Sequence, residues 1–179
     1  SSMRILVALD SFKGTMTAAE ACEIVAAAIR SRRPEATVVE LPMADGGEGT
    51  IEALVASCDG CLVTPQAVAG PLPGTQVIAS YGWLPSTHTA VVEMARASGL
   101  PLVQADQRDP LRATTHGTGQ LIKAALARGC RKVLLTLGGS ATVDGGTGAA
   151  RALGWQFLDA DGNPVPEGGG SLGEIARIV

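Results

Sequence analysis

The chain has 179 residues, of which 46% are hydrophobic and 17% charged, and its formal net charge is −3. This composition is typical of one globular domain or two small ones, and it excludes a disordered or low-complexity protein. No apolar run approaches the roughly 18 residues of a membrane span, and no Lys or Arg block indicates a surface for nucleic acid or acidic lipid. We therefore expect a small-molecule ligand, with no nucleic-acid or membrane partner.

The first third of the chain alternates between strand and helix patterns. Strands are predicted over Arg4–Leu9 and Thr37–Leu41, and helices over Thr17–Arg32 and Glu48–Ser57. Thr17 and Glu20 have the spacing of a capping box, which marks the start of the first helix. This alternation predicts a parallel, Rossmann-like α/β sheet over residues 3–69. Met3 is the expected natural start, and no secretory signal pattern follows it, so we expect a cytoplasmic location.

The middle of the chain has strand patterns without long helices between them. They cover Cys61–Val68, Gln76–Trp83 and His88–Met94. Such a run favours an antiparallel or mixed patch, and we place a domain boundary near Gly70. The α/β rhythm then returns, with a helix over Gly119–Arg128, a strand over Lys132–Leu137 and a short helix over Thr147–Leu153. Residues 70–179 are therefore predicted to form a second α/β domain with mixed strands.

Cys58 and Cys61 form a lone CxxC pair. A tetrahedral zinc site would need a second pair at similar spacing, and Cys22 and Cys130 do not supply one. We interpret the pair as two ordinary cysteines that flank a turn.

Four polar or glycine-rich loops each follow a predicted strand, precede a predicted helix, or do both. They cover residues 10–15, 44–50, 114–119 and 138–146. Ligands of open parallel sheets bind at the carboxyl ends of the strands, where helix N-termini offer free N–H groups to anions. The loops together therefore predict an anion site.

The first loop supplies Asp10, Ser11 and Lys13 within four residues. Lys is a suitable point charge for a phosphate or carboxylate. The alternative is a solvated turn in which the carboxylate and hydroxyl cap the following helix.

The second loop combines glycines with carboxylates ahead of a helix. Gly46 and Gly47 allow the backbone to approach a ligand closely. Glu48 fits the favourable charge of a helix start, which is a structural role. Asp45 lies further out and is the better candidate for a general base or a Mg²⁺ ligand.

The third loop offers Thr115 and Gly117 at a helix start, where hydroxyl and N–H groups hold anions. His116 is a candidate acid or base, although a lone histidine is more often structural, and Thr118 is equally well a plain N-cap.

The fourth loop carries the strongest local signal. Its nine residues include Gly138, Gly139, Ser140, Thr142 and Asp144, whereas most connections between a strand and a helix have about 2–6 residues. The chain contains no P-loop and no HExxH pattern, and the Gly117-Thr-Gly119 pair lacks the third glycine, at position 122, that a dinucleotide-binding fingerprint needs. The loops suit phosphoryl transfer, and they suit binding of a carbohydrate or organic acid without chemistry equally well.

Taken together, the four loops resemble the glycerate kinase family of the bacterial glycerate 2-kinase type. The matching segments are Asp10-Ser-Phe-Lys-Gly-Thr15, Pro42-Met-Ala-Asp-Gly-Gly-Glu-Gly-Thr50, Thr115-His-Gly-Thr-Gly-Gln120 and Gly138-Gly-Ser-Ala-Thr-Val-Asp-Gly-Gly146. Val92-Glu-Met-Ala95, Ala97-Ser-Gly-Leu100 and Asp109-Pro-Leu-Arg112 match as well. The family often has Asn in place of Val143 and Tyr in place of His116.

The resemblance implies phosphorylation of D-glycerate to 2-phosphoglycerate with ATP and Mg²⁺, in a cleft between two α/β domains. Lys13 would then neutralise a phosphate or the glycerate carboxylate. Of Asp45 and Asp144, one would act as general base and the other would help hold Mg²⁺. Family members are about twice as long, so the chain is expected to be their N-terminal half. A non-catalytic binding module and a kinase for a related small hydroxy acid are the alternatives, and the oligomeric state is not predicted.

Overall fold

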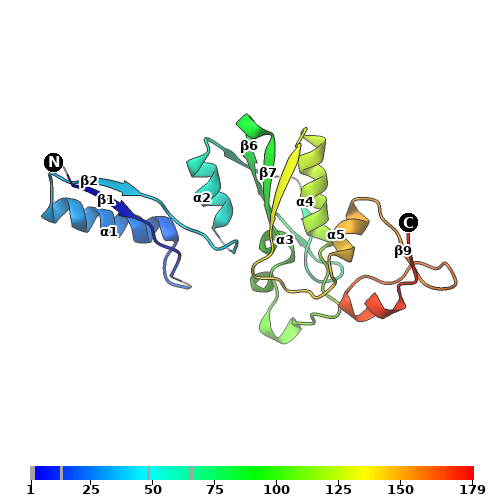
Figure 1. Ribbon diagram of the computed structural model, residues 1–179. Coiled ribbons are helices and arrows are strands. Elements are labelled where there is room, and N and C mark those ends of the chain that lie inside the picture. Colours follow the sequence, from blue (N-terminus) through cyan, green and yellow to red (C-terminus); the bar gives the residue numbers. More distant parts are fainter. Residues whose placement is uncertain (1–2, 13, 48, 65–66) are drawn as a thin grey trace.

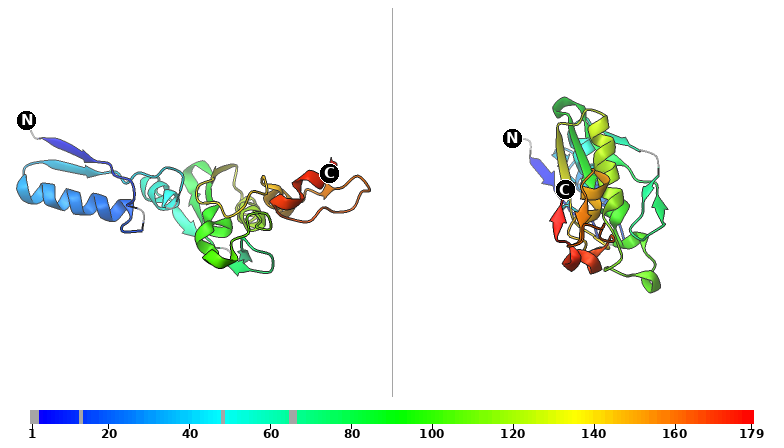
Figure 2. Two further views of the ribbon diagram at one scale, coloured as in Figure 1. Left: turned by 90° about the horizontal axis from the view of Figure 1, so that it is seen from below. Right: turned by 90° about the vertical axis from the view of Figure 1, so that its right-hand side faces the viewer.

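The computed structural model describes residues 3–12, 14–47, 49–64 and 67–179. Three parts follow one another along a line: an N-terminal strand–helix–strand unit, a central sheet with helices, and a C-terminal segment (Figure 1). The view from below in Figure 2 shows the same separation of the N-terminal unit from the central sheet. Parallel and mixed sheets occur together with helices, so the predicted mixed α/β class is confirmed.

The N-terminal unit is a parallel two-stranded sheet with one crossover helix. It consists of β1 (Arg4–Val7), α1 (Ala18–Arg32) and β2 (Thr37–Glu40). The predicted capping box is present, because the Thr17 hydroxyl accepts a hydrogen bond from the Glu20 N–H and the Glu20 carboxylate accepts one from the Thr17 N–H. A small core of Val7, Cys22 and Ala26 joins the helix to the sheet.

The central sheet has the order β3-β6-β7-β8. These strands are Cys61–Val63, Tyr81–Leu84, Thr89–Glu93 and Lys132–Thr136. The β3–β6 and β6–β7 pairs are antiparallel and β7–β8 is parallel, which is the mixed arrangement expected for the middle of the chain. Two predicted strands are interrupted, because β4 (Val68–Ala69) and β5 (Gln76–Val77) pair with each other in a separate hairpin.

Helices cover both faces of the central sheet. On one face α2 (Thr50–Ser57) packs through Ile51 against Leu84 and Val91. On the other face lies α4 (His116–Ala127), and the larger core cluster comprises Val68, Ala79, Tyr81, Trp83, Ala90, Val92, Ala97, Leu121, Ala125 and Cys130. Since β3 and β6 pair, this sheet spans residue 70, and the domain boundary near Gly70 stays a prediction.

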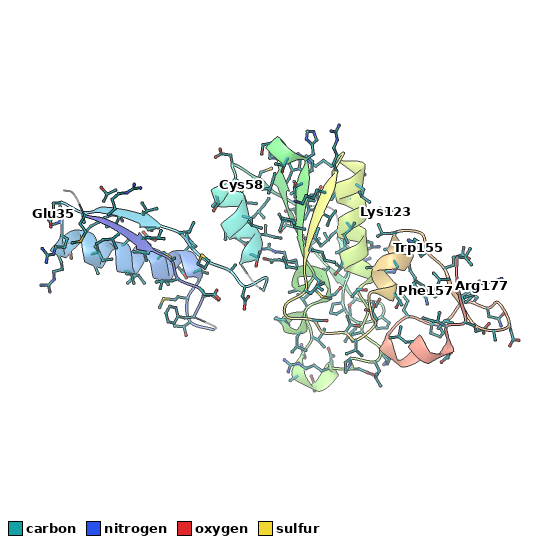
Figure 3. All side chains as sticks on the ribbon, in the orientation of Figure 1. Glu35, Cys58, Lys123, Trp155, Phe157 and Arg177 are labelled. Carbon is teal, nitrogen blue, oxygen red and sulfur yellow. The ribbon has the colours of Figure 1, made fainter. Side chains whose placement is uncertain are left out.

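The remaining elements are short. They are α3 (Ala95–Ser98), α5 (Thr147–Ala152), the 3-10 helices η1 (Pro85–Thr87), η2 (Leu100–Leu102), η3 (Ala105–Gln107) and η4 (Gly169–Glu174), and the antiparallel pair β9 (Phe157–Leu158) and β10 (Arg177–Ile178). Phe157 and Arg177, both labelled in Figure 3, lie in this C-terminal segment, where the Arg151 guanidinium sits 5.1 Å from the Phe157 ring centroid.

The CxxC pair flanks a turn, as predicted. Cys58 follows α2, Cys61 begins β3, and all four cysteines are free. Figure 3 shows Cys58 at the end of α2 that faces away from the glycine loops. Among the residues described, no helix is both long and apolar enough to cross a membrane.

Candidate functional site

The second and fourth loops touch at the carboxyl end of the central sheet. The fourth loop leaves β8, and the second loop leads into α2, which packs on β6 and β7. A Cβ atom on Gly138 would lie 2.8 Å from Gly47 Cα and 3.1 Å from the Gly46 carbonyl oxygen, so a side chain at 138 would push the loops apart. Glycine is therefore required for this contact.

Asp45 is the accessible carboxylate at this junction. Its side chain is exposed, and Oδ1 accepts a hydrogen bond from the Gly47 N–H at 2.9 Å. Gly46 follows with φ +91°, a conformation that glycine adopts without strain. Oδ2 makes no hydrogen bond to another described residue, so this oxygen is available to a substrate.

Asp144, in contrast, is a buried anchor. Its side chain is 1% exposed, and Oδ2 accepts hydrogen bonds from the Thr115 N–H (2.8 Å), the Thr115 hydroxyl (2.8 Å) and the Gly148 N–H (3.1 Å). Oδ1 accepts from the Gly146 N–H at 3.0 Å. The carboxylate thus joins the third loop to the start of α5. In this arrangement neither oxygen is open to a substrate hydroxyl or a metal, which disfavours both roles expected for it.

Other side chains of the fourth loop also bind the protein itself. The Thr142 hydroxyl donates to the Ala113 carbonyl at 2.6 Å and accepts from the Asp144 N–H at 3.0 Å. The exposed Ser140 hydroxyl donates to the Thr142 carbonyl at 2.9 Å. The Gly139 carbonyl accepts from the Leu100 N–H at 2.8 Å. The loop is therefore held in one shape by its own polar groups.

The third loop packs against the protein more than it faces outward. A Cβ on Gly117 would lie 1.8 Å from the Ala69 carbonyl oxygen, so this glycine permits close packing of α4 on β4. The Thr115 hydroxyl also accepts from the Ala149 N–H at 2.9 Å. His116 Nδ1 lies 2.9 Å from Glu167 Oε1. Glu167 comes from the turn-rich C-terminal segment, and no sequence signal pointed to it.

The first loop belongs to the N-terminal unit. Its Asp10 side chain is exposed and accepts a hydrogen bond from the Ser11 N–H at 2.7 Å. The Met43 N–H donates to the Leu9 carbonyl at 2.8 Å, so the first and second loops begin side by side. Lys13 and Glu48, both singled out from the sequence, lie outside the described residues.

A buried charge cluster below the second loop was not predicted. Glu93, 2% exposed at the end of β7, accepts hydrogen bonds from the Ile51 N–H and from Arg96 Nε, both at 2.8 Å. The Arg96 guanidinium also donates to Ser80 and Glu52. Burial opposes the charge of Arg96, but the hydrogen bonds to Glu52 and Glu93 outweigh it and raise the pKa of the guanidinium. Glu93 thereby fixes the start of α2 at the sheet edge.

A metal site was expected at these loops. The described residues contain no group of three or more His, Cys, Asp or Glu side chains placed to hold a metal ion. Mg²⁺ in phosphoryl-transfer sites is usually bound by one or two carboxylates together with substrate phosphates. Asp45 and Asp10 are the exposed carboxylates that fit this arrangement.

Comparison with known proteins identifies relatives of the chain. The sequence profile of the glycerate kinase family matches residues 5–179. The chain is 47% identical to a glycerate kinase of Bacillus subtilis and 46% identical to a glycerate 2-kinase of Escherichia coli K12, in each case over 98% of this chain and 46% of the relative. A crystal structure from Salmonella typhimurium LT2, provisionally described as glycerate kinase 2, aligns with a TM-score of 0.86 at 44% identity, over 99% of this chain and 48% of that one. The chain thus spans about half the length of the curated relatives it matches.

Proposed function

Because the chain belongs to the glycerate kinase family, we propose that it takes part in ATP-dependent phosphorylation of D-glycerate to 2-phosphoglycerate. The names of its relatives support a kinase that acts on glycerate. Phosphorylation of the 2-hydroxyl is the finer part of the proposal, and it follows the resemblance to the 2-kinase type.

One observation carries the proposal: two glycine loops meet at the carboxyl end of the central sheet, with the Asp45 carboxylate exposed beside the contact. Phosphoryl transfer asks the protein to position donor and acceptor and to stabilise phosphate charge, with little covalent chemistry of its own. Backbone N–H groups reach ligand oxygens only where side chains do not block them, and Gly46 and Gly138 carry no side chain that would do so.

We assign the general base to Asp45. Its free oxygen would take the proton of the glycerate 2-hydroxyl as that hydroxyl oxygen attacks the γ-phosphorus, and ADP leaves with the electrons of the broken P–O bond. Asp144 acts as a positioning residue, since it orients Thr115 and the fourth loop through four hydrogen bonds.

The charge of the transferred phosphoryl group would be met by Lys13 and by Mg²⁺. Lys13 keeps the role predicted for it, as a point charge toward a phosphate or the glycerate carboxylate. Mg²⁺, when bound, neutralises phosphate charge, and Asp10 would supply its protein oxygen.

The test is to incubate the 179-residue chain with Mg-ATP and D-glycerate and to follow the products by ³¹P NMR. A 2-phosphoglycerate resonance above an enzyme-free control supports the proposal in full. A 3-phosphoglycerate resonance would support D-glycerate as the substrate and would contradict phosphorylation at the 2-hydroxyl. Tartronate and hydroxypyruvate, offered in parallel, test the alternative of a kinase for another small acid.

Variants of the active protein test the residue roles. Lys13→Ala and Asp45→Asn are expected to slow turnover by roughly 10²–10³, the cost of losing a group aimed at the transition state. Asp161→Asn, in the exposed turn at residues 159–163, is the matched control and should leave the rate unchanged. Near-normal rates for both Lys13→Ala and Asp45→Asn would remove these assignments.

A second candidate is a binding module without turnover. The observation that favours it is the shared length, because the chain matches only 46% of its relatives. Binding of D-glycerate or ATP in a calorimeter, combined with no phosphorylated product, would support this function over the first.

A further inference from the structure

A pocket of about 260 Å³ lies beside the fourth loop. Its wall is mostly apolar, with Leu100, Val103, Ala113 and Ala141 among the lining residues. The polar residues of the lining are Arg108, Asp109, Ser140 and Thr142. Ligand pockets in proteins are generally about 300–1,000 Å³, apolar, with a few well-placed polar groups. A pocket slightly smaller than this suits a single ring system.

The pocket is formed by segments that hydrogen bonds already hold together. The Ala141 N–H donates to the Ser98 carbonyl at 2.9 Å, and the Thr142 hydroxyl donates to the Ala113 carbonyl at 2.6 Å. The Val143 N–H donates to the Pro110 carbonyl at 3.3 Å. Because these bonds do not depend on a ligand, the pocket is preformed, and binding costs little ordering of the loop.

Resting on the proposed function, we infer that this pocket binds the purine base of the nucleotide. The two substrates differ in chemistry: every carbon of glycerate bears oxygen, whereas a purine has two apolar faces and a polar edge. An apolar wall therefore suits only the base. Ser140, which also lines the pocket, offers a hydroxyl to a ring edge or a ribose.

The position of the pocket also determines how the bound nucleotide would be oriented. Ser140 lines the pocket, and Gly138, two residues earlier, contacts Gly47 beside Asp45. Three residues of chain reach at most about 10 Å, which is the scale of a linked triphosphate. The phosphates would run along residues 138–140 and bring the γ-phosphoryl group to the second loop. The fourth loop thus takes ATP, and the second loop takes glycerate.

Arg108 is suited to the anionic part of the ligand. Its guanidinium makes no hydrogen bond or ion pair with another residue in the described part of the chain. An exposed cation at the rim of the pocket favours a nucleotide over the free nucleoside. ATP and adenosine therefore separate the two contributions.

Isothermal titration of the 179-residue chain with adenosine, ATP and D-glycerate tests this site. Ala141→Leu fills the pocket and should weaken adenosine and ATP roughly tenfold or more, since added methylenes in a packed site force repacking. Arg108→Ala should weaken ATP roughly tenfold and leave adenosine unchanged. Ala160→Leu, in the exposed turn at residues 159–163, makes the same chemical change outside the pocket and should alter nothing.

Val143→Glu is the alternative variant if circular dichroism shows that Ala141→Leu does not fold. Val143 lines the pocket but is 55% exposed, so a carboxylate there leaves the core intact while weakening adenosine. No adenosine binding by the unaltered chain, or unchanged binding by folded pocket variants, overturns the site.

The failure of this inference is distinguishable from failure of the proposed function. If the chain phosphorylates D-glycerate and Ala141→Leu does not change the KM for ATP, the proposed function stands and the assignment of the pocket to the nucleotide is wrong. Adenosine binding that the pocket variants weaken, with no phosphorylation by the unaltered chain, keeps the nucleotide pocket and removes the kinase activity from this chain.

Discussion

The two sheets of this protein are covered to different extents. The central sheet has α2 on one face and α4 on the other, and Val91 and Val92, adjacent on β7, are both fully buried on opposite faces. Among the residues that the structure describes, the β1–β2 sheet is covered by α1 alone, on the face of Ile5 and Val7. On its other face Leu6 and Val39 are register partners and remain 60% and 40% exposed.

This difference identifies the β1–β2 sheet of the N-terminal unit as the sheet with an uncovered apolar face. Parallel sheets occur almost only with both faces covered, and a two-stranded sheet is marginal by itself. The unit also has an open apolar groove of about 550 Å³, lined by Met3 and by residues of β1 and α1 that include Ile5 and Ile24. The first loop belongs to this unit. The pocket proposed for the purine base and the fourth loop belong to the central sheet, which is covered on both faces.

The largest effect is expected from the loss of the buried Asp144 carboxylate, beside the central sheet. Asp144→Ala removes the acceptor of four hydrogen bonds in a site that water does not reach. Each orphaned buried donor carries a desolvation penalty, so the free energy of unfolding should fall by about 3–5 kcal/mol. Urea denaturation followed by circular dichroism measures it.

Two further variants calibrate the Asp144 result. Asp144→Asn keeps one oxygen acceptor and should fall between the natural chain and Asp144→Ala. Asp161→Ala, on an exposed turn, should change stability by no more than about 0.5 kcal/mol. Equal stability of Asp144→Ala and Asp161→Ala would show that the buried network is not an anchor.

The contrast between Asp144 and Asp45 also shows the limit of the sequence. The strand and helix order, the capping box and the meeting of glycine loops at a sheet edge follow from local patterns and from the rule for parallel strands. Burial of Asp144 does not, because its partner Thr115 is 29 residues away. Glu93 likewise binds the backbone of Ile51, 42 residues away. Only the packed chain determines these pairs.

Glycine content carries the same ambiguity. Gly46 has a positive φ and lies at the loop junction, whereas Gly117 is helical and permits contact with the Ala69 carbonyl. Both stand in short polar clusters in the sequence. The two glycines in the first turn of α4 also explain why the predicted start, Gly119, is three residues late. Glycine lowers helix propensity, but packing overrides it, and the helix begins at His116.

The bare face of the N-terminal unit predicts self-association. Exposed apolar patches favour association with another apolar surface, and the same face of a second copy supplies one. Size-exclusion chromatography with light scattering should show a concentration-dependent dimer. Leu6→Glu together with Val39→Lys should raise its dissociation constant by roughly tenfold or more, because two apolar side chains leave the interface.

Ile78→Lys is the matched control for that surface. Ile78 is 70% exposed but follows β5, outside the N-terminal unit, so its replacement should leave the dimer unchanged. A monodisperse monomer at every concentration, or equal effects of the two sets of variants, would contradict the role of the bare face.

The smallest effect is expected at the start of α1, in the N-terminal unit. Two hydrogen bonds lower the pKa of the Glu20 carboxyl below its ordinary value, first from the Thr17 N–H at 2.8 Å and then from the Thr17 hydroxyl at 2.9 Å. A lowered folded-state pKa contributes stability above the unfolded-state pKa, and the contribution is lost as the pH falls through the folded-state value. The start of α1 should therefore loosen as the pH falls through the folded-state pKa of Glu20.

An NMR titration of the Glu20 carboxyl carbon measures this effect. In Thr17→Ala the pKa should rise toward the ordinary value without reaching it, because the hydroxyl is lost and the backbone N–H remains. Thr37→Ala, an exposed threonine of the same unit, should leave the titration unchanged. If Glu20 titrates identically in Thr17→Ala and the natural chain, the hydroxyl does not contribute to the cap, and α1 is held by its packing on β1 and β2 alone.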